Sequence, residues 1–519
     1  MWQAVDQSDP AARHSGVKPR ENGHINPSRP KLFATPASIV MKSMGTPKGL
    51  PLVGNVFDVN PSNTWQSLQR LSEKHGEIFQ IKVLGNTIVF VAGSALAEEL
   101  CDEKRFRKYV GGPIVEIRRA VHDALFTAYE NEENWGVAHR IIAPRLTPDA
   151  VREWCGEVVD CTSELIGKWK GMSESGGGAS RADGVLLIDE LNRLNLEATT
   201  LTMFGKKLNC IPAKESHPML QGMEDSTSEA MKRPTRPRLF NWLFFGGKFN
   251  RSIKVMREDY AADLVYHRKQ NPTSRRDILW DLMEGQDEQT GRGMTESQVV
   301  DEIVSMPIGS STAPCLVASA VYFLLQNKEC IAKAREELDQ IVGPWSRDAA
   351  QVQADHLPRL KYIEGIVRES LRLSFPAPGF NIEPVPRPTG PSGDADKSPI
   401  LLAGGKYQVA HNQPMIIVLA GVNRDPAVFD EPLAFRPERM MGDLFEDLPA
   451  GVKKWFGNGK RECIGKHWAW QFNMIATAML IRECDFEMVD PSWKLDGHQD
   501  GWFNLRPVEF RVRVKPRAV

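Results

Sequence analysis

Residues 456–465, with the sequence FGNGKRECIG, constrain this chain more than any other part of it. Gly457 and Gly459 allow a tight turn that brings backbone N–H groups toward the sulfur of Cys463. Such hydrogen bonds lower the electron density on a metal-bound thiolate, and a helix starting just after the cysteine points its positive end at the sulfur. Glu462 stands where a dinucleotide-binding loop needs a third glycine, so that motif is excluded. The segment therefore indicates a metal-ligating thiolate, with an inert cysteine in a glycine-rich turn as the alternative.

Two further pairs of residues have helical spacing. Glu369 and Arg372 are three residues apart, so their side chains share a helix face and can form an ion pair. Trp135 and His139 are four residues apart and also share a face. Taken alone, the first pair is typical of a surface ion pair and the second of an ordinary packed helix.

In combination, these motifs resemble the cytochrome P450 superfamily. The glycine-rich segment matches the ten-residue heme-binding signature of that family at every defined position, namely Phe456, Gly457, Gly459, Arg461, Cys463 and Gly465. The resemblance implies a b-type heme with Cys463 as the axial ligand of the iron. It also implies that Phe456 shields the thiolate from water and that Arg461, Trp135 and His139 hold the heme propionates.

The same resemblance implies a structural lock behind the heme. The family has an ExxR pair followed by a Pro-Glu-Arg segment, and here Glu369 and Arg372 precede the sequence PLAFRPERM at 432–440. We therefore expect Glu369, Arg372 and Arg439 to interlock. The implied fold is mainly α, the cytochrome P450 fold with a small β-rich lobe. We assign residues 46–519 to this heme domain and residues 1–45, which are polar and rich in proline, to a disordered tail.

A long buried helix is predicted to begin at Thr295. Thr295 and Gln298 have the spacing of a capping box, and the apolar run that follows continues for some thirty residues. Pro307 and Pro314 each remove a backbone N–H from this helix, so we expect a kink there and free carbonyls at residues 303 and 310.

The middle of this helix departs from the family pattern. The resemblance implies an acid followed by an alcohol for oxygen activation, and here these positions are Ser311 and Thr312. Thr312 can still donate a hydrogen bond, whereas the usual proton source is missing and a water held by Ser311 would have to replace it. Either ordinary monooxygenation has survived this change, or the chemistry does not require O2.

The substrate pocket is expected to be apolar. The segments CDEKRF, LFTAY and NWGVAHRI look most like the soluble fatty-acid-hydroxylating subgroup, which implies pocket roles for Phe126 and Ile308. That subgroup anchors the substrate carboxylate with an Arg and a Tyr, and the matching positions here are Asn86 and Phe90. We therefore expect a hydrophobic small molecule, in the biosynthesis of a specialised (secondary) metabolite, rather than a free fatty acid.

Composition limits which partners and which cellular compartment can be expected. The 519 residues have a net charge of −1, which favours neither nucleic acid nor acidic membranes, and no stretch predicts a transmembrane anchor or a signal peptide. The eight cysteines form no CxxC pair, so we expect reduced thiols and a cytoplasmic protein. The subgroup is normally fused to a diflavin reductase, but no flavin motif occurs here. Electrons are expected from a separate NADPH-cytochrome P450 reductase or another flavoprotein, steered by lysines around the thiolate loop: Lys453, Lys454, Lys460 and Lys466.

Three functions stay open at this point. The first is a reductase-dependent monooxygenase that inserts one oxygen atom of O2 into its substrate. The second is a heme-thiolate enzyme that does not use O2, such as an isomerase, a dehydratase or a peroxide-dependent oxidase. The third is a heme sensor, against which the retained Thr312 and Phe126 speak.

Overall fold

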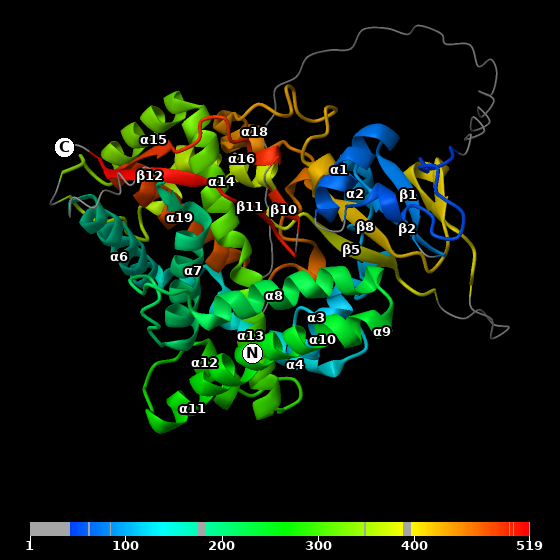
Figure 1. Cartoon of the computed structure of the whole chain (residues 1–519), viewed down its shortest axis with the longest axis horizontal. Helices are drawn as coiled ribbons and strands as arrows, with labels where there is room; N and C mark the ends of the chain where they lie inside the picture. Colours follow the sequence, from blue (N-terminus) through cyan, green and yellow to red (C-terminus); the bar gives the residue numbers. More distant parts are fainter. Residues whose placement is uncertain are drawn as a thin grey trace, which may run out of the picture. The chain divides into compact units, whose positions relative to one another are not determined.

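Helices dominate the computed structural model (Figure 1), which describes residues 42–517 apart from gaps at 61–62, 84, 175–182, 347–348, 388–395, 498 and 502. Most of the predicted N-terminal tail thus lies outside the described residues. The helices on the N-terminal side of the long central helix are α1 Thr64–His75, α2 Ser94–Glu99, α3 Pro113–Val121, α4 Glu133–Ile142, α5 Pro148–Arg152, α6 Cys155–Glu174, α7 Leu187–Phe204, α8 Pro218–Lys232, α9 Arg238–Phe240, α10 Gly246–Lys254, α11 Asp263–Gln270 and α12 Ile278–Glu284. The remaining helices are α13 Glu296–Ser310, α14 Thr312–Gln326, α15 Lys328–Ile341, α16 Lys361–Ser374, α17 Leu419–Val422, α18 Gly442–Glu446 and α19 Lys466–Glu483.

The strands form small sheets, and the largest of them lies on the right of Figure 1. The largest has the order β1-β2-β8-β5-β3 and contains β1 Ile78–Val83, β2 Asn86–Val91, β3 Phe106–Lys108, β5 Gly379–Pro384 and β8 Met415–Val418. The other strands pair as β4-β12-β9, β6-β7 and β10-β11, with β4 Val185–Leu186, β6 Ile400–Leu402, β7 Tyr407–Val409, β9 Cys484–Met488, β10 Gln499–Gly501, β11 Leu505–Pro507 and β12 Arg511–Pro516. The mainly helical fold with a β lobe is therefore confirmed.

A β-hairpin forms one edge of the largest sheet. Strands β1 and β2 pair antiparallel from Ile78 opposite Val91 to Val83 opposite Asn86. Gly85 in the connection has a φ of 87°, a left-handed conformation that glycine adopts without strain. Parallel pairing of β2 with β8 brings this hairpin onto the segment that follows α16.

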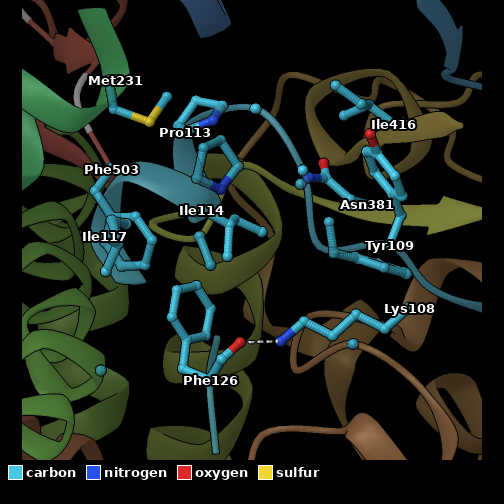
Figure 2. Close-up of a pocket in the computed structure, with 18 of the residues that line it drawn as sticks. Lys108, Tyr109, Pro113, Ile114, Ile117, Phe126, Met231, Asn381, Ile416 and Phe503 are labelled. Carbon is cyan, nitrogen blue, oxygen red and sulfur yellow. Dashed lines mark hydrogen bonds between the residues drawn. The ribbon is translucent and has the colours of Figure 1, made fainter. Parts of the chain in front are cut away.

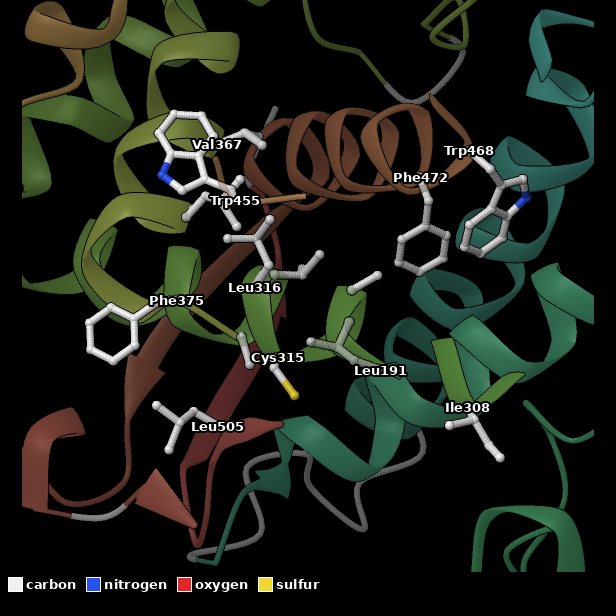
Figure 3. Close-up of a cluster of buried hydrophobic side chains, with 14 of the residues drawn as sticks. Leu191, Ile308, Cys315, Leu316, Val367, Phe375, Trp455, Trp468, Phe472 and Leu505 are labelled. Carbon is white, nitrogen blue, oxygen red and sulfur yellow. The ribbon is translucent and has the colours of Figure 1, made fainter. Parts of the chain in front are cut away.

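The hydrophobic core is built around α14. It packs against α7, α16 and α19, and Figure 3 shows side chains of these helices meeting in one cluster. Leu316 from α14 lies near Val367 from α16 and Trp455, while Trp468 and Phe472 from α19 stack with ring centroids 5.3 Å apart. Because its second half is apolar on nearly every side, the span 296–326 is also long and apolar enough to cross a membrane. Some 72% of its most apolar window is nevertheless buried inside the molecule, as in a core helix.

The central helix starts and breaks where its sequence predicts. Thr295 accepts from the backbone N–H of Gln298, whose side chain in turn accepts from the backbone N–H of Thr295, which completes the capping box. The helix divides at Ser311 into α13 and α14. Pro307 lies within α13, whereas Pro314 occupies the third position of α14, where a backbone N–H has no partner within the helix in any case. The two prolines thus bracket the break.

Candidate active site

A cavity of about 1730 Å³ lies between the β lobe and the central helix. Its walls come from β1, β2, β3 and β5, the start of α3, the loop before α4, the α13–α14 junction and the glycine-rich segment 456–465. Figure 2 shows part of it: Phe126, Ile114, Ile117 and Phe503 gather on one side, and Tyr109 lies on the other. The lining is mainly apolar, as expected for a site that takes a hydrophobic molecule.

Cys463 is the only one of the eight cysteines whose side chain is exposed, and it opens onto this cavity. Its backbone N–H donates to the carbonyl of Phe456 at 2.8 Å, and Gly457 and Gly459 have φ values of 83° and 61°. The turn needs glycine at both positions. Burial from bulk solvent raises the pKa of the Cys463 thiol, and the backbone N–H of Gly465 opposes that shift by stabilising the thiolate.

The start of α19 at Lys466 comes three residues after Cys463, so the N-terminal end of that helix faces the same sulfur. A bound metal cation deprotonates a coordinating thiol outright, which overrides the effect of burial. Phe456 and Gly465 also line the cavity next to Cys463. The residues of the glycine-rich segment are therefore arranged to hold one metal centre through one sulfur.

Aromatic and cationic side chains gather on the neighbouring wall. Trp135 and His139 from α4 stack at 5.0 Å, and the Arg461 guanidinium lies 5.2 Å from the Trp135 ring. Arg461 also donates to the backbone carbonyls of Ala128 at 2.9 Å and Leu125 at 3.3 Å. Burial lowers the pKa of His139, and the charges of its neighbour in α4 and of Arg461 lower it further. The structure thus brings together Arg461, Trp135 and His139, the three residues that the family resemblance assigned to the heme propionates.

Lys108 in β3 joins this wall, although no sequence motif predicts it. Its Nζ donates to the carbonyl of Phe126 at 2.5 Å, the dashed line in Figure 2. Burial, together with the charge of Arg461, lowers its pKa to about 7, and Cys463 opposes the shift. In the described part of the chain Lys108 has no acidic partner, and Arg461 has only Glu130 at 3.7 Å.

A wall with two neighbouring cations and so little acid suits an anionic ligand. The cavity therefore offers one metal donor, the Cys463 sulfur, within mainly apolar walls. The cationic side chains and the Trp135 indole lie at its edge. These residues fit a heme, whose propionates would supply the missing negative charge.

The α13–α14 junction forms one wall of the cavity, and only some of the residues at this junction face the cavity. Ile308, Gly309, Ser310 and Thr312 line the cavity, and the Thr312 hydroxyl donates to the Gly309 carbonyl at 3.4 Å. Ser311 is not among the lining residues.

The polar groups of Ser311 have partners elsewhere. Its hydroxyl donates to the Ile308 carbonyl at 2.7 Å and accepts from the Asn504 side-chain amide at 3.2 Å. The same amide donates to the Ser311 carbonyl at 2.9 Å. Asn504 thus bonds both oxygens of Ser311, and the predicted role of Ser311 in holding a water stays a prediction.

An acid that the sequence analysis did not single out lies one turn before the cavity. Glu302 in α13 is buried and accepts from the backbone N–H of Leu125 at 2.9 Å and from the hydroxyl of Ser305 at 3.2 Å. Burial raises the pKa of Glu302 to about 8; the hydrogen bonds from Leu125 and Ser305 oppose that shift, and the charges of Asp301 and Asp123 favour it. Ser305 lines the cavity, so a carboxyl that holds its proton near neutral pH is one hydrogen bond from the cavity wall.

The pocket residues expected from the sequence lie on the walls. Phe126 meets Phe503 edge to face at 5.4 Å, and Phe90, Ile308 and Asn86 line the cavity as well. Cations that line other parts of the wall are paired: Arg107 with Glu383 at 2.8 Å, Arg236 with Glu229 at 2.7 Å and Lys248 with Asp225 at 2.9 Å.

Behind the cavity, α16 carries a fully buried ion pair. Arg372 donates to both carboxylate oxygens of Glu369, at 2.7 and 2.8 Å, and its remaining N–H groups donate to backbone carbonyls between residues 423 and 434. The Nε of Arg439 lies 3.5 Å from the Glu369 carboxylate. All three predicted residues therefore meet, and none of them lines the cavity.

Each of the four lysines near the thiolate loop has a partner within the protein. Lys453 donates to the Glu446 carbonyl at 2.8 Å and Lys454 to the Asn458 side chain at 2.7 Å. Lys460 pairs with Glu130, and Lys466 pairs with Glu462 at 2.5 Å.

The family model and the related proteins all identify the same family. Residues 44–512 match the family model described as cytochrome P450. The chain is 34% identical to the bifunctional cytochrome P450/NADPH–P450 reductase ascE of Acremonium egyptiacum over 478 residues, which cover 91% of this chain and 43% of that relative. It is 35% identical to the self-sufficient cytochrome P450 monooxygenase CYP505E5 of Aspergillus kawachii and 33% identical to CYP505E3 of Phanerodontia chrysosporium, with similar coverage. The chain therefore spans less than half the length of these curated relatives.

Proposed function

The chain belongs to the cytochrome P450 family, whose members bind heme iron, and from this membership we propose that it is a monooxygenase acting on a hydrophobic small molecule. Such an enzyme inserts one oxygen atom of O2 into its substrate. The observation that carries the proposal is the placement of Cys463 in the floor of a large apolar cavity, with Thr312 on another wall.

Each residue of the site has a proposed task. Heme iron, held by the Cys463 sulfur, supplies the oxygen chemistry. The Gly465 N–H tunes the sulfur, and Phe456 keeps water from it. Arg461, Lys108, Trp135 and His139 hold the propionates.

We propose that Glu302 supplies the proton that the family usually takes from the position of Ser311. Its carboxyl keeps a proton near neutral pH, and the Ser305 hydroxyl connects it with the cavity. Asp301 beside it is buried and paired with Arg257 and His122. Thr312 then orients the donated proton by hydrogen bonding, as general acid catalysis requires.

The pocket supports a neutral substrate. Asn86 and Phe90 occupy the positions that bind a carboxylate in the resembled subgroup, and Arg107, Arg236 and Lys248 are already paired. A specialised metabolite without a free carboxylate fits these walls better than a fatty acid does. We therefore propose a specialised metabolite of this kind as the substrate.

An NADPH-dependent flavoprotein reductase is the proposed electron donor, acting as a separate protein. Positive charge around the thiolate loop supports this, although each lysine there already has a partner. If Lys460 and Lys466 steer an acidic reductase, the rate of heme reduction falls steeply with salt and falls again in the Lys460→Glu, Lys466→Glu variant. A cytoplasmic location stays a prediction.

A second candidate is heme-thiolate chemistry without O2, such as isomerisation, dehydration or use of peroxide. The observation that favours it is the absence of an acid at positions 309–312, where the Ser311 hydroxyl is already bonded to Ile308 and Asn504. A heme sensor is disfavoured by the size of the cavity.

One experiment separates these functions. With substrate and an added reductase, a monooxygenase consumes O2 and NADPH in proportion to product. Glu302→Gln is expected to lower the product formed per NADPH, because help from a general acid is worth roughly 10²–10⁴-fold in rate. Product formed without O2 or NADPH would establish the second candidate instead. Unchanged coupling in Glu302→Gln would leave monooxygenation in place and remove Glu302 from it.

A further inference from the structure

Two uncharged polar side chains lie opposite each other where β3 ends. The ladder of β3 and β5 sets Lys108 opposite Ile382, and the backbone N–H of Tyr109 donates to the Asn381 carbonyl at 3.0 Å, which extends the ladder by one pair. Directly opposed residues of antiparallel strands point their side chains to the same face, with Cβ atoms roughly 4.5–5.5 Å apart. Tyr109 and Asn381 both line the cavity, and Figure 2 shows them on the side away from Phe126. We call these two residues the polar pair.

The polar pair is available for a ligand. In the described part of the chain, neither the Tyr109 hydroxyl nor the Asn381 side-chain amide has a hydrogen-bond partner. Arg107 and Glu383 follow on the same face of the ladder and pair with each other at 2.8 Å, so this part of the wall carries no net charge. Burial and the Glu383 charge raise the pKa of Tyr109, so its hydroxyl keeps the proton that it can donate.

Gly111 fixes the position of the Tyr109 ring. A Cβ atom at position 111 would overlap the ring carbons and the hydroxyl oxygen of Tyr109. The ring therefore folds over the backbone of Gly111 and occupies the space that any other side chain would fill. Because the ring is held there, its hydroxyl stays at one place on the cavity wall.

The same row of the sheet continues with apolar side chains. Asn381 lies opposite Ile416 in β8, and Ile416 lies beside Phe90 in β2. Both of these apolar residues line the cavity. One end of the row thus offers hydrogen bonds and the rest offers apolar contact, as in pockets where a few polar groups orient a mainly hydrophobic ligand.

We propose that the polar pair binds an uncharged hydroxyl group of the substrate, an alcohol or a phenol, while the apolar part of the same molecule lies along Ile416 and Phe90. The ligand hydroxyl accepts from the Tyr109 hydroxyl and donates to the Asn381 amide oxygen. A ketone would leave that amide oxygen without a donor. A carboxylate would meet no free cation on this wall, because Arg107 is already paired with Glu383. The inference rests on the proposed function, since it names the substrate class of the same cavity.

Spectral titration of the heme-loaded chain tests the proposal without turnover, because a ligand that displaces water from heme iron changes the absorption spectrum. The probes are 1-decanol and 1-chlorodecane, which share one alkyl chain and differ in the hydroxyl. Tyr109→Phe, Asn381→Leu should weaken the binding of 1-decanol by about tenfold, which corresponds to about 1.4 kcal/mol, and leave that of 1-chlorodecane unchanged. The matched control is Asn86→Leu, which removes another amide from the cavity wall and should affect neither probe.

The double variant keeps the ring on Gly111, and its heme content checks that it folds. Equal weakening of both probes would overturn the proposal, because the substitutions would then act only through the shape of the wall. So would a wild type that gives no spectral response to 1-decanol. Faster transfer of heme to apomyoglobin from the double variant would also overturn it, since the polar pair would then hold a heme propionate. The titration consumes neither O2 nor NADPH, so its outcome is independent of the monooxygenase assay.

Discussion

Cys463 and Lys108 differ in how far their roles could be predicted from the sequence alone. Cys463 stands in a contiguous signature, so its role could be predicted from ten residues of sequence. The role of Lys108 depends on the nearby charge of Arg461 and on a hydrogen bond to the Phe126 carbonyl. Only the fold brings these residues together. Glu302 is similar: an acid in a helix is usually exposed, and only burial against Leu125 makes it unusual.

Heme retention is expected to depend on Lys108. In Lys108→Met the wall loses a cation that would bond a propionate, and a hydrogen bond to a charged group contributes about 1.5–3 kcal/mol. The rate of heme transfer to apomyoglobin should therefore rise by at least about tenfold. Arg107→Met is the control, because Arg107 is adjacent in sequence and pairs with Glu383. Equal rates in the two variants would exclude Lys108 from the heme site.

Glu302 should make stability depend on pH. Its pKa in the folded protein is about 8, above the ordinary 4.5, so folding favours the protonated form. This contribution is fully present below about pH 4.5 and is lost as the pH rises through about 8. Glu302→Gln keeps an oxygen for the Leu125 N–H but cannot ionise. Its free energy of unfolding relative to wild type should therefore increase between about pH 5 and pH 9 in urea titrations; a difference independent of pH would contradict the assignment.

Among the elements, the break between α13 and α14 follows from the local sequence. Two prolines predict the break, and a capping box predicts the start of the helix. The contact between Asn504 and both oxygens of Ser311 could not be predicted, because Asn504 lies almost two hundred residues away. Local steric rules thus indicate where a helix breaks, and tertiary structure decides which side chains contact the break.

Removing the Asn504 side chain should destabilise the break. In Asn504→Ala the carbonyl and the hydroxyl of Ser311 each lose a hydrogen bond, and one such bond contributes about 0.5–1.5 kcal/mol to the free energy of unfolding. Ser311→Ala is the matched control, since it removes the hydroxyl and leaves the carbonyl bonded. Denaturant unfolding should show the larger loss for Asn504→Ala. The reverse order would mean that the hydroxyl, rather than the carbonyl, holds the junction.

The buried pair in α16 ties that helix to the segment before the thiolate loop. Glu369→Gln leaves the Arg372 charge buried without a counter-ion, which costs about 3–5 kcal/mol. Little heme-loaded protein should be recovered. Glu431→Gln breaks an exposed pair with Arg436 in the same region and should cost about 0–1 kcal/mol. Similar heme yields from both variants would show that the buried pair does not support the fold.

For the molecule as a whole, the fold class followed from the order of a few motifs rather than from hydrophobic patterning. Glu369, Arg372 and Cys463 occur in an order that a family shares, and the family match over residues 44–512 agrees with it. The size of the cavity and the exposure of the apolar residues 239–245 could not be predicted in this way. The cavity depends on how distant elements meet, and Trp242 looks in sequence like any core residue although it is exposed.

The central claim is that Cys463 binds heme iron as a thiolate, and the absorption spectrum of the reduced carbon monoxide complex tests it most directly. Wild type and Cys101→Ser, which changes a cysteine outside the cavity, should both give the long-wavelength band characteristic of a thiolate ligand. Cys463→Ser should lose that band. If Cys463→Ser retains it, the iron has another thiolate ligand and the account of the site is wrong.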